Sequence, residues 1–168
     1  MTTVLHATSK KDFSTIAHLA HIIWTEHYTP IIGEEQVSYM LDKFQSAQAM
    51  EDQVKEGYHY YLLQHENTPV GYFSFNPKDS FLFLSKLYVL SSERGKGIGR
   101  KAIEFIEDQA RKLGKSKIRL TVNKYNSNSI AAYEKIGFVN IDSIVQDIGN
   151  GFVMDDYVLE QELDNRVT

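Results

Sequence analysis

The segment FLFLSKLYVLSSERGKGIGRKAIEFIEDQARKLG, residues 81–114, contains the strongest structural signal in the chain. It begins with a largely apolar run that is typical of a central strand buried on both faces. A glycine-rich turn follows, and Gly114 is placed to end the helix that comes after it. One face of that helix is traced by apolar residues at helical spacing: Ile98, Ala102, Phe105, Ile106 and Leu113. The pattern predicts a buried strand, a turn and an amphipathic helix in direct succession.

The turn has the chemistry of an anion site. Gly95, Gly97 and Gly99 lack side chains, so backbone N–H groups can approach a ligand closely. The start of a helix adds free N–H donors and the positive end of the helix dipole. Positive charge is supplied by three basic side chains, Arg94, Lys96 and Arg100. These residues predict a diphosphate site; the alternative interpretation is a glycine-rich turn with ordinary surface cations.

Three other phosphate-binding motifs fit the turn poorly. A P-loop needs Ser or Thr after the lysine, whereas Lys96 is followed by Gly97. The dinucleotide fingerprint is closer, because Gly97, Gly99 and Ala102 spell G-x-G-x-x-A after a strand. It requires an acidic residue about 20 residues further on, and that region reads IRLTVN, residues 118–123. A kinase glycine loop needs a far longer chain. A nucleotide-binding module therefore stays open only as an alternative.

Helical spacing also appears in the first third of the chain. Ser9 and Asp12 have the spacing of a capping box before a helix that Pro30 and Gly33 are expected to interrupt. A second amphipathic helix is predicted from residue 34, and a short one over about residues 47–55.

The remaining segments alternate between strand and helix patterns. Strands are predicted over residues 58–65, 70–76, 81–90, 115–123, 139–148 and 152–163, and a short helix over 127–136 that Gly137 closes. Strands mixed with crossover helices predict an α/β fold whose sheet is antiparallel at its start and parallel near its middle. We expect one domain over residues 1–168 with its core at about 10–163, and a frayed end from Asp164.

Composition limits the possible partners. The chain has 168 residues, a net charge of −4 and no cysteine, so we expect no general attraction for nucleic acid or an anionic membrane. It lacks the apolar segment of a signal peptide and any run of about 20 apolar residues that would span a bilayer. Six histidines are present without acidic partners at metal-ligand spacing. We expect a cytoplasmic protein with no metal.

Two motifs resemble those of the GCN5-related N-acetyltransferase (GNAT) superfamily. Arg94, Gly97 and Gly99 match its Arg/Gln-x-x-Gly-x-Gly/Ala signature. About 30 residues later, NSNSIAAYEKIGF at residues 126–138 resembles the family's second segment with compressed spacing. The matching positions there are Asn128, Ala131 or Ala132, Tyr133, Gly137 and Phe138. The order of elements matches from about residue 10 to 163.

This resemblance implies a single-domain acyl-CoA N-acyltransferase (GNAT) fold, a mixed twisted β-sheet with a splayed central strand pair flanked by helices. It implies acetyl-CoA as cosubstrate, with the pantetheine arm between a bulged strand ending in residues 87–89 and the strand of residues 120–123. The Leu87 N–H would face the acetyl carbonyl and Val89 would pair with the pantetheine amide. The implied coenzyme contacts are Leu87, Tyr88, Val89, Arg94, Gly95, Lys96, Gly97, Ile98, Gly99, Arg100, Asn123, Asn128, Ala131, Tyr133 and Lys135.

The resemblance also implies that the Tyr133 hydroxyl protonates the departing thiolate. Some family members carry a glutamate base on the central strand, but Phe83 stands at that position here. The residues that remain as candidates for the base are Glu26, His27 and Tyr28 on the first helix, with ordered water as a relay. Glu26 and His27 rank first among them.

The acceptor is expected to be a small amine. EHYTPIIGEEQVSYMLDKF, residues 26–44, resembles the corresponding segment of bacterial spermine and spermidine acetyltransferases. Carboxylates that would attract a polyamine are Glu34, Glu35, Asp155 and Asp156. Peptide or protein N-acetylation and a non-catalytic acetyl-CoA sensor remain alternatives, because a fold does not determine its substrate. The tyrosine-rich strands leave homodimerisation possible.

Overall fold

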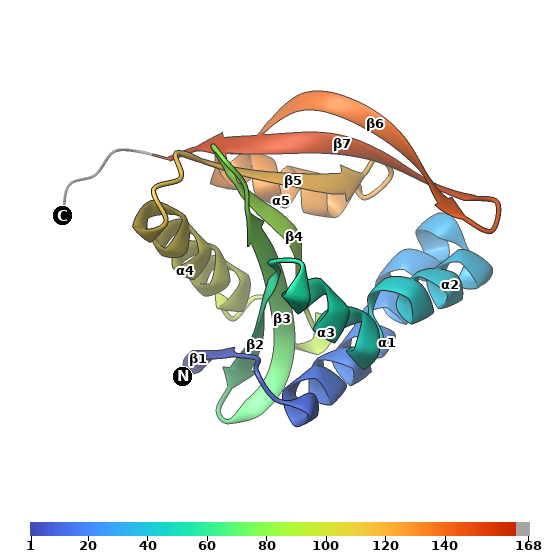
Figure 1. Ribbon diagram of the computed structural model, residues 1–168, viewed down its shortest axis with the longest axis horizontal. Helices are drawn as coiled ribbons and strands as arrows, with labels where there is room; N and C mark the ends of the chain where they lie inside the picture. The colour runs from blue at the N-terminus through green and yellow to red at the C-terminus, as the bar shows by residue number, and fades with distance from the viewer. Residues whose placement is uncertain (164–168) are drawn as a thin grey trace. The chain divides into compact units, whose positions relative to one another are not determined.

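The computed structural model describes residues 1–163, so the frayed end expected from Asp164 lies outside the described residues. The elements follow one another in the order β1 (Thr2–His6), α1 (Lys10–Ile32), α2 (Glu34–Phe44), α3 (Ala47–Lys55), β2 (His59–His65), β3 (Thr68–Pro77), β4 (Leu82–Val89), a 3-10 turn (Ser91–Glu93), α4 (Ile98–Lys112), β5 (Lys117–Asn123), α5 (Ser127–Ile136), β6 (Val139–Gly149) and β7 (Phe152–Glu162). Figure 1 labels these helices and strands.

The seven strands form one mixed sheet in the order β1-β2-β3-β4-β5-β7-β6. This confirms the α/β prediction, including the antiparallel start and the parallel β4–β5 pair. By contacts the chain divides into two compact units. The first holds Met1–Asn76 and Ser85–Ile106; the second holds Pro77–Leu84 and the chain from Glu107 on. The expectation of one domain over residues 1–168 stays a prediction.

In the first unit, the capping box at the start of α1 is present. The Asp12 N–H donates to Ser9 Oγ (3.2 Å), and Asp12 Oδ2 accepts from the Ser9 N–H (3.2 Å). The expected interruption at Pro30 is wrong, because α1 continues through Pro30 to Ile32. Pro30 lies in the last turn, where its missing N–H removes only one helical hydrogen bond. Gly33, with φ of 88°, ends the helix, as predicted.

The strands of the first unit begin as an antiparallel meander. The strands predicted over residues 58–65 and 70–76 form a hairpin: His65 pairs with Thr68, and Glu66 and Asn67 both have positive φ, as a tight hairpin turn requires. Strand β1 was not predicted. It pairs with β2 from Thr2 opposite His65 onward, and its five residues are too few to show a clear alternation.

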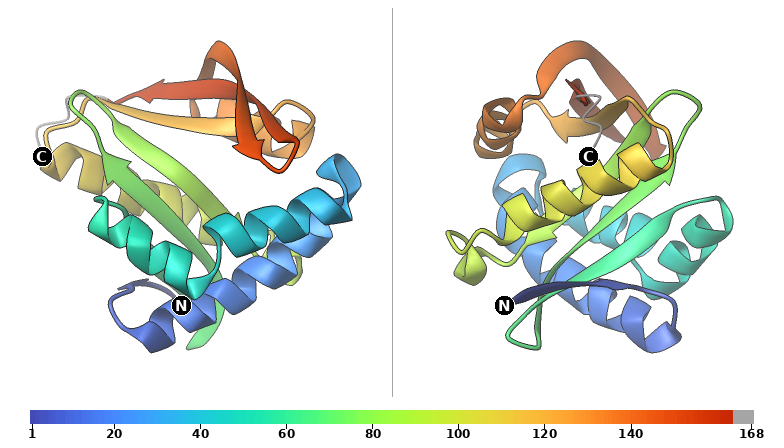
Figure 2. Two further views of the ribbon diagram at one scale, coloured as in Figure 1. Left: turned by 45° about the vertical axis from the view of Figure 1, so that its right-hand side comes forward. Right: turned by 90° about the vertical axis from the view of Figure 1, so that its left-hand side faces the viewer.

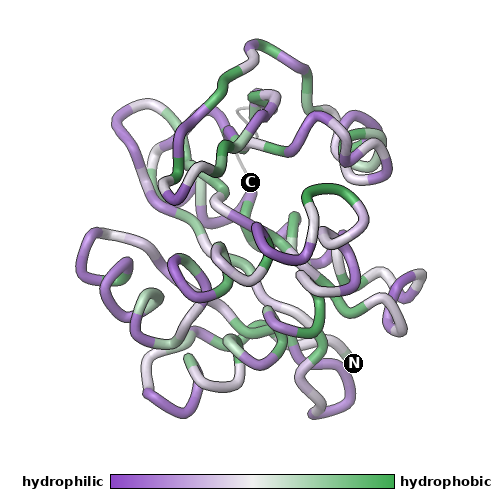
Figure 3. Tube along the Cα trace, turned by 90° about the vertical axis from the view of Figure 1, so that its right-hand side faces the viewer, coloured by the Kyte–Doolittle hydropathy of each residue, from purple (hydrophilic) through white to green (hydrophobic). Residues whose placement is uncertain are grey.

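The two faces of these strands are covered by different helices (Figure 2). Tyr60 and Tyr72 face α1–α3, since Tyr60 contacts Phe13 and Tyr72 accepts a hydrogen bond from Trp24. On the opposite face, side chains of β2 and β3 meet the Phe105 ring of α4: the rings of Tyr61 and Phe73 lie 5.1 and 5.8 Å from it. In Figure 3 the helical turns carry both hydrophilic and hydrophobic residues, as amphipathic helices do.

In the second unit, β5 and β6 each pair antiparallel with β7. The first residues of β4 pair in parallel with β5, Leu82 opposite Ile118 and Phe83 opposite Arg119, and the ladder ends there. Glu160 of β7 accepts hydrogen bonds from the Arg119 guanidinium at 2.9 and 2.7 Å. Helix α5 lies beside β5 in Figure 1. Gly137, with φ of 123°, ends it as predicted.

Candidate active site

The glycine-rich turn has an open backbone. Gly95 and Gly97 adopt φ of 83° and 77°, which non-glycine residues rarely do. Apart from the adjacent residues and the backbone of the same helix, no atom of residues 1–163 lies within 4 Å of a Cβ built on Gly95, Gly97 or Gly99. The first helical bond of α4 runs from the Lys101 N–H to the Gly97 carbonyl (3.1 Å). The N–H groups of residues 98–100 precede it, so they are available to an anion at the helix start.

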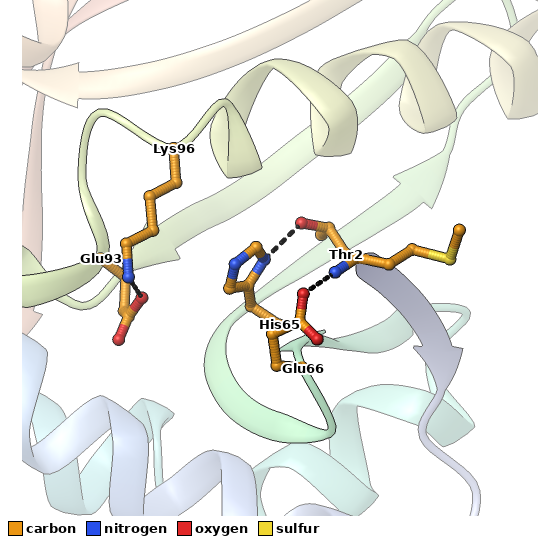
Figure 4. A network of polar contacts seen from close by, with 6 residues as sticks. Thr2, His65, Glu66, Glu93 and Lys96 are labelled. Carbon is orange, nitrogen blue, oxygen red and sulfur yellow. Dashed lines mark hydrogen bonds and ion pairs between the residues drawn. The ribbon is translucent and has the colours of Figure 1, made fainter.

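The glycine turn is exposed up to the start of α4, where the chain becomes buried. Ile98 is only 1% exposed and anchors the start of α4, whereas residues 94–97 are exposed. Lys96 is held by an ion pair with Glu93, Nζ to Oε2 2.6 Å (Figure 4). Figure 4 also shows a neighbouring contact in the same unit, Thr2 Oγ1 with His65 Nδ1 at 3.0 Å. An anion at the turn would compete with Glu93 for the Lys96 ammonium.

The end of β4 approaches β3 very closely at Gly71. A Cβ on Gly71 would lie 2.3 Å from the Tyr88 carbonyl oxygen and 3.1 Å from Val89 Cα. After this contact, the Leu90 N–H donates to the Val70 carbonyl (2.8 Å). The backbone that carries Leu87 and Val89 is therefore held against a position where only glycine fits.

Aromatic residues of α1 pack on this end of β4. The hydroxyls of Tyr28 and Tyr88 lie 2.9 Å apart, and the Trp24 ring contacts both tyrosines. Trp24 Nε1–H donates to Tyr72 Oη (3.1 Å), whose hydroxyl donates to Gln45 Oε1 (2.8 Å). Burial raises the Tyr72 pKa well above its usual value. The predicted contact residue Tyr88 is thus part of a buried polar cluster.

The predicted base candidates of α1 lie next to that cluster. Glu26 is exposed, and its Oε2 accepts a hydrogen bond from the Ser91 hydroxyl (2.9 Å). Ser91 belongs to the turn between β4 and the glycines, so Glu26 lies near the predicted phosphate loop. The His27 ring is partly buried and contacts Tyr28 with ring centres 4.8 Å apart.

The second unit contains the other predicted coenzyme residues. Asn123 ends β5, and its Oδ1 accepts from the Tyr125 N–H (2.9 Å). Asn128, Ala131 and Lys135 are exposed on α5. Tyr133 is partly buried, and its ring packs against Phe138 with centres 5.4 Å apart. The roles predicted for these residues remain predictions.

The acidic pair of the second unit lies inside the strand predicted over residues 152–163. Asp155 and Asp156 lie within strand β7, and Asp156 is only 3% exposed. Asp155 forms an ion pair with Lys124, Oδ1 to Nζ 2.8 Å, and this hydrogen bond raises the Lys124 pKa. Burial, together with the Asp155 charge, raises the Asp156 pKa to about 6. Their role in attracting an amine remains a prediction.

A groove of about 450 Å³ runs between α1 and α2 in the first unit. The side of α1 contributes His21, Thr25 and Thr29 at a spacing of four residues, and the side of α2 contributes Glu34, Ser38 and Asp42. Glu34 was predicted to attract an amine, and Asp42 joins it on the same face. Asp42 could have been found from its spacing of eight residues, about two helical turns, from Glu34.

Lys86 was missed by the sequence analysis. It lies inside the apolar β4 segment, and its Nζ donates a hydrogen bond to Tyr60 Oη (3.0 Å). Desolvation lowers its pKa to about 7. The available signal was a lysine within a strand expected to be buried, because such a lysine needs a partner or loses its charge.

Within residues 1–163, none of the helices is long and apolar enough to cross a membrane. The same described part of the chain contains no group of three or more His, Cys, Asp or Glu side chains placed to hold a metal ion.

Solved structures with the same fold are numerous. The PaiA N-acetyltransferase from Thermoplasma acidophilum, solved with coenzyme A, superposes with a TM-score of 0.80 over 96% of this chain and 99% of that one, at 21% identity. At that level of identity the likeness shows the fold, which matches the GNAT prediction.

Curated relatives match over shorter stretches. The N-acetyltransferase YjgM of Escherichia coli K12 is 31% identical over 90 residues, which are 51% of this chain and 54% of that protein. The D-amino-acid N-acetyltransferase HPA3 of Saccharomyces cerevisiae is 32% identical over 60 residues, 36% of this chain and 37% of that protein. The chain thus spans about half the length, or less, of the curated relatives it matches.

A model of the acetyltransferase (GNAT) family matches residues 17–138, which include the glycine-rich turn and the predicted Tyr133 segment. This match covers well over half of the chain. The protein therefore belongs to the acetyltransferase (GNAT) family.

Proposed function

We propose that the protein is an N-acetyltransferase that moves the acetyl group of acetyl-CoA to a primary amine by direct attack in a ternary complex. The observation that carries the proposal is the exposed glycine turn before α4, with its free N–H groups and positive-φ glycines. Family membership and the coenzyme A in the PaiA structure support it. A diphosphate at this turn would hold the coenzyme by its most strongly charged group.

The proposed coenzyme contacts are those that the family resemblance implies. Arg94–Arg100 bind the diphosphate, the Leu87 N–H bonds to the acetyl carbonyl, and Val89 pairs with the pantetheine amide. The other proposed contacts are Asn123, Asn128, Ala131 and Lys135. Charge grows on the acetyl oxygen as the amine attacks, and loss of one donor to such an oxygen typically costs roughly 3 to 4 kcal/mol.

The reaction needs two proton movements. An alkyl ammonium with a pKa near 10.4 is neutral in only about one of 2,500 molecules at pH 7, a deficit of roughly 4.6 kcal/mol. A base must therefore take a proton before attack. We infer that Tyr133 supplies the other proton to the coenzyme thiolate, since a phenol is protonated at neutral pH.

We further propose that the acceptor is a linear polyamine or another small amine. The α1–α2 groove supports this, because its two carboxylates, Glu34 and Asp42, lie about 12 Å apart along α2. A chain with charged nitrogens at both ends matches that arrangement. The D-amino-acid acetyltransferase relative shows that another small-amine class must be compared with it.

A thiol-release assay with acetyl-CoA tests the proposal against a panel of polyamines, D- and L-amino acids and peptides. Release with an amine and not without one is expected. Tight coenzyme binding without release would favour an acetyl-CoA sensor, and release with peptides alone would favour peptide or protein N-acetylation.

Calorimetric titration with coenzyme A and with a nicotinamide dinucleotide separates the remaining alternative. Binding of the dinucleotide alone would identify a nucleotide-binding module and refute the proposal. A cytoplasmic location and a homodimer stay predictions, which cell fractionation and analytical ultracentrifugation would test.

A further inference from the structure

A chain of hydrogen bonds connects β4 to the helices that cover the first unit. Lys86 Nζ donates to Tyr60 Oη (3.0 Å), and the Tyr60 hydroxyl donates to Gln53 Oε1 (2.5 Å). Gln53 Nε2 then donates to the Phe44 carbonyl (2.9 Å) at the end of α2. Because every link is buried or partly buried, the Lys86 amine is held in one place.

The amine of Lys86 keeps a lone pair available. Desolvation lowers its pKa to about 7, so a large fraction is neutral at pH 7 to 8. A neutral amine has two N–H donors and one lone pair, and the bond to Tyr60 uses a donor. Among residues 1–163 the structure shows no other hydrogen bond of Lys86 Nζ.

The protonated form of Lys86 also has support. Tyr60 Oη accepts a hydrogen bond from the amine in either state, and the Tyr60 ring lies 5.4 Å from Nζ, within the range of a cation–π contact. Burial raises the pKa of Tyr60, which keeps its hydroxyl protonated and bonded to Gln53. Lys86 can therefore gain a proton without losing its position.

The groups that face this side of the strands are mostly phenols. They come from β2, β3, β4 and α1: Tyr60, Tyr72, Tyr88 and Tyr28. Next to Tyr28 in α1 lies the His27 ring, and α3 contributes the neutral Gln53. Desolvation lowers the pKa of Lys86, and none of these neighbouring groups is a carboxylate that would hold its proton.

Lys86 directly precedes Leu87, whose N–H is the proposed donor to the acetyl carbonyl. A lysine side chain is long enough to bring its nitrogen to an amine that attacks beside this peptide group. The α1 candidate Glu26 is exposed, and its carboxylate accepts a hydrogen bond from Ser91. On β4, Phe83 supplies no base.

We propose that Lys86 is the general base of the transfer and accepts a proton from the acceptor ammonium. The inference rests on the proposed acetyltransferase function. The acceptor ammonium gives one proton to Lys86, and the freed amine forms a bond to the acetyl carbon. The bond from that carbon to the coenzyme sulfur breaks, the sulfur leaves as a thiolate and takes a proton from the Tyr133 hydroxyl, and the second proton of the nitrogen restores that hydroxyl. Lys86 then returns its proton to solvent.

The first test measures the titration of the Lys86 amine and does not depend on enzyme activity. Competitive labelling of the intact protein with isotopic acetic anhydride, between about pH 5.5 and 11, reports the neutral fraction of each lysine by mass spectrometry. Lys86 is expected to titrate near pH 7, and the exposed Lys55 serves as the control with an ordinary lysine midpoint near 10.4. A midpoint for Lys86 that coincides with Lys55 would overturn the inference.

The second test compares Lys86→Met with the control Lys55→Met in the thiol-release assay. At pH 7.5 we expect kcat of Lys86→Met to fall about 10²- to 10⁴-fold, while KM for acetyl-CoA stays unchanged. Activity should recover as the pH approaches about 10.4, where the acceptor deprotonates itself. A purely structural role would not produce recovery at high pH, so an unchanged kcat or a loss that is equal at all pH values refutes the role.

Tyr60→Phe keeps the test decisive if Lys86→Met fails to fold. Removing the acceptor of the Lys86 hydrogen bond destabilises the ammonium form, so the acidic limb of the kcat–pH profile should move to lower pH. An unmoved limb counts against Lys86. If the wild-type protein releases no thiol with any amine, the proposed function fails; a wild-type activity that ignores Lys86 refutes only this inference.

Discussion

Gly71→Ala is the substitution that most directly tests the role of β4. The new Cβ would lie 2.3 Å from the Tyr88 carbonyl oxygen and 3.1 Å from Val89 Cα, both in the backbone. Gly71 is not among the glycines with positive φ, so alanine meets no torsional penalty there. The whole effect comes from the collision with β4.

The size of the effect follows from the distances. Ordinary contacts of a Cβ begin at 3.4 Å, so β4 must recede by about 1 Å at Tyr88. Overpacking of this kind typically costs about 1 to 3 kcal/mol of unfolding free energy. A shift of about 1 Å in catalytic groups can cost about 100-fold in rate. We therefore expect kcat/KM for acetyl-CoA to fall about 10- to 100-fold.

Urea unfolding and the thiol-release assay measure the two effects separately. Gly99→Ala is the matched control for the stability effect, because its φ is ordinary and, outside its own helix and neighbouring residues, no described atom lies within 4 Å of the added Cβ. It should leave stability unchanged or raise it by up to about 1 kcal/mol, since alanine favours a helix. It should still raise KM for acetyl-CoA, because the methyl group enters the proposed diphosphate site.

The reasoning would be refuted if Gly71→Ala kept both the wild-type unfolding free energy and the wild-type kcat/KM. Lost stability with unchanged kinetics would show that the end of β4 is structural and that its N–H groups do not bind the thioester.

Three further substitutions test other parts of the molecule. Tyr133→Phe should lower kcat about 10²-fold or more with unchanged coenzyme affinity, as measured by thiol release and calorimetry; equal turnover would remove Tyr133 from the mechanism. The raised pKa of Asp156 stabilises the folded protein. This stabilisation is complete below pH 3.8, the pKa of the unfolded chain, and it is lost as the pH rises through about 6. Asp156→Asn should therefore unfold at a higher urea concentration than wild type at pH 8. The difference in unfolding free energy between the variant and wild type should be about 2 to 3 kcal/mol larger at pH 8 than at pH 4, and a difference that does not change with pH would contradict this. Glu160→Gln weakens charge-assisted hydrogen bonds from Arg119 and should cost about 1 to 3 kcal/mol at pH 7. Because its carboxyl pKa is lowered, this loss should disappear as the medium is acidified through that pKa, and persistence in acid would argue against the ion pair.

Several features were predictable because their signals are local. Ser9 and Asp12 are three residues apart and satisfy each other's backbone groups, whatever the rest of the chain does. Glu66 and Asn67 form a hairpin turn between two strand patterns, and Gly137 ends α5 with a positive φ. The glycine turn before α4 was predictable for the same reason: its open backbone follows from the absence of side chains.

Other features depended on distant partners. Strand β1 exists because β2 lies beside it, and five residues alone carry no such information. The Pro30 prediction failed because a missing hydrogen bond near a helix end costs little when the helix packs on a sheet. Asp156 lies in a strand that was predicted, but its burial arises only when β7 pairs with β5 and β6.

The sequence alone determined the α/β class, the glycine turn at the start of α4 and the family resemblance, because each depends on residues that are neighbours in the chain. The tertiary structure decided which polar groups are chemically unusual. Lys86 meets Tyr60 across 26 residues, and Trp24 meets Tyr72 across 48. Desolvation is a sum over all atoms that exclude water from a group, so the lowered pKa of Lys86 and the raised pKa of Asp156 arise only when distant segments come together.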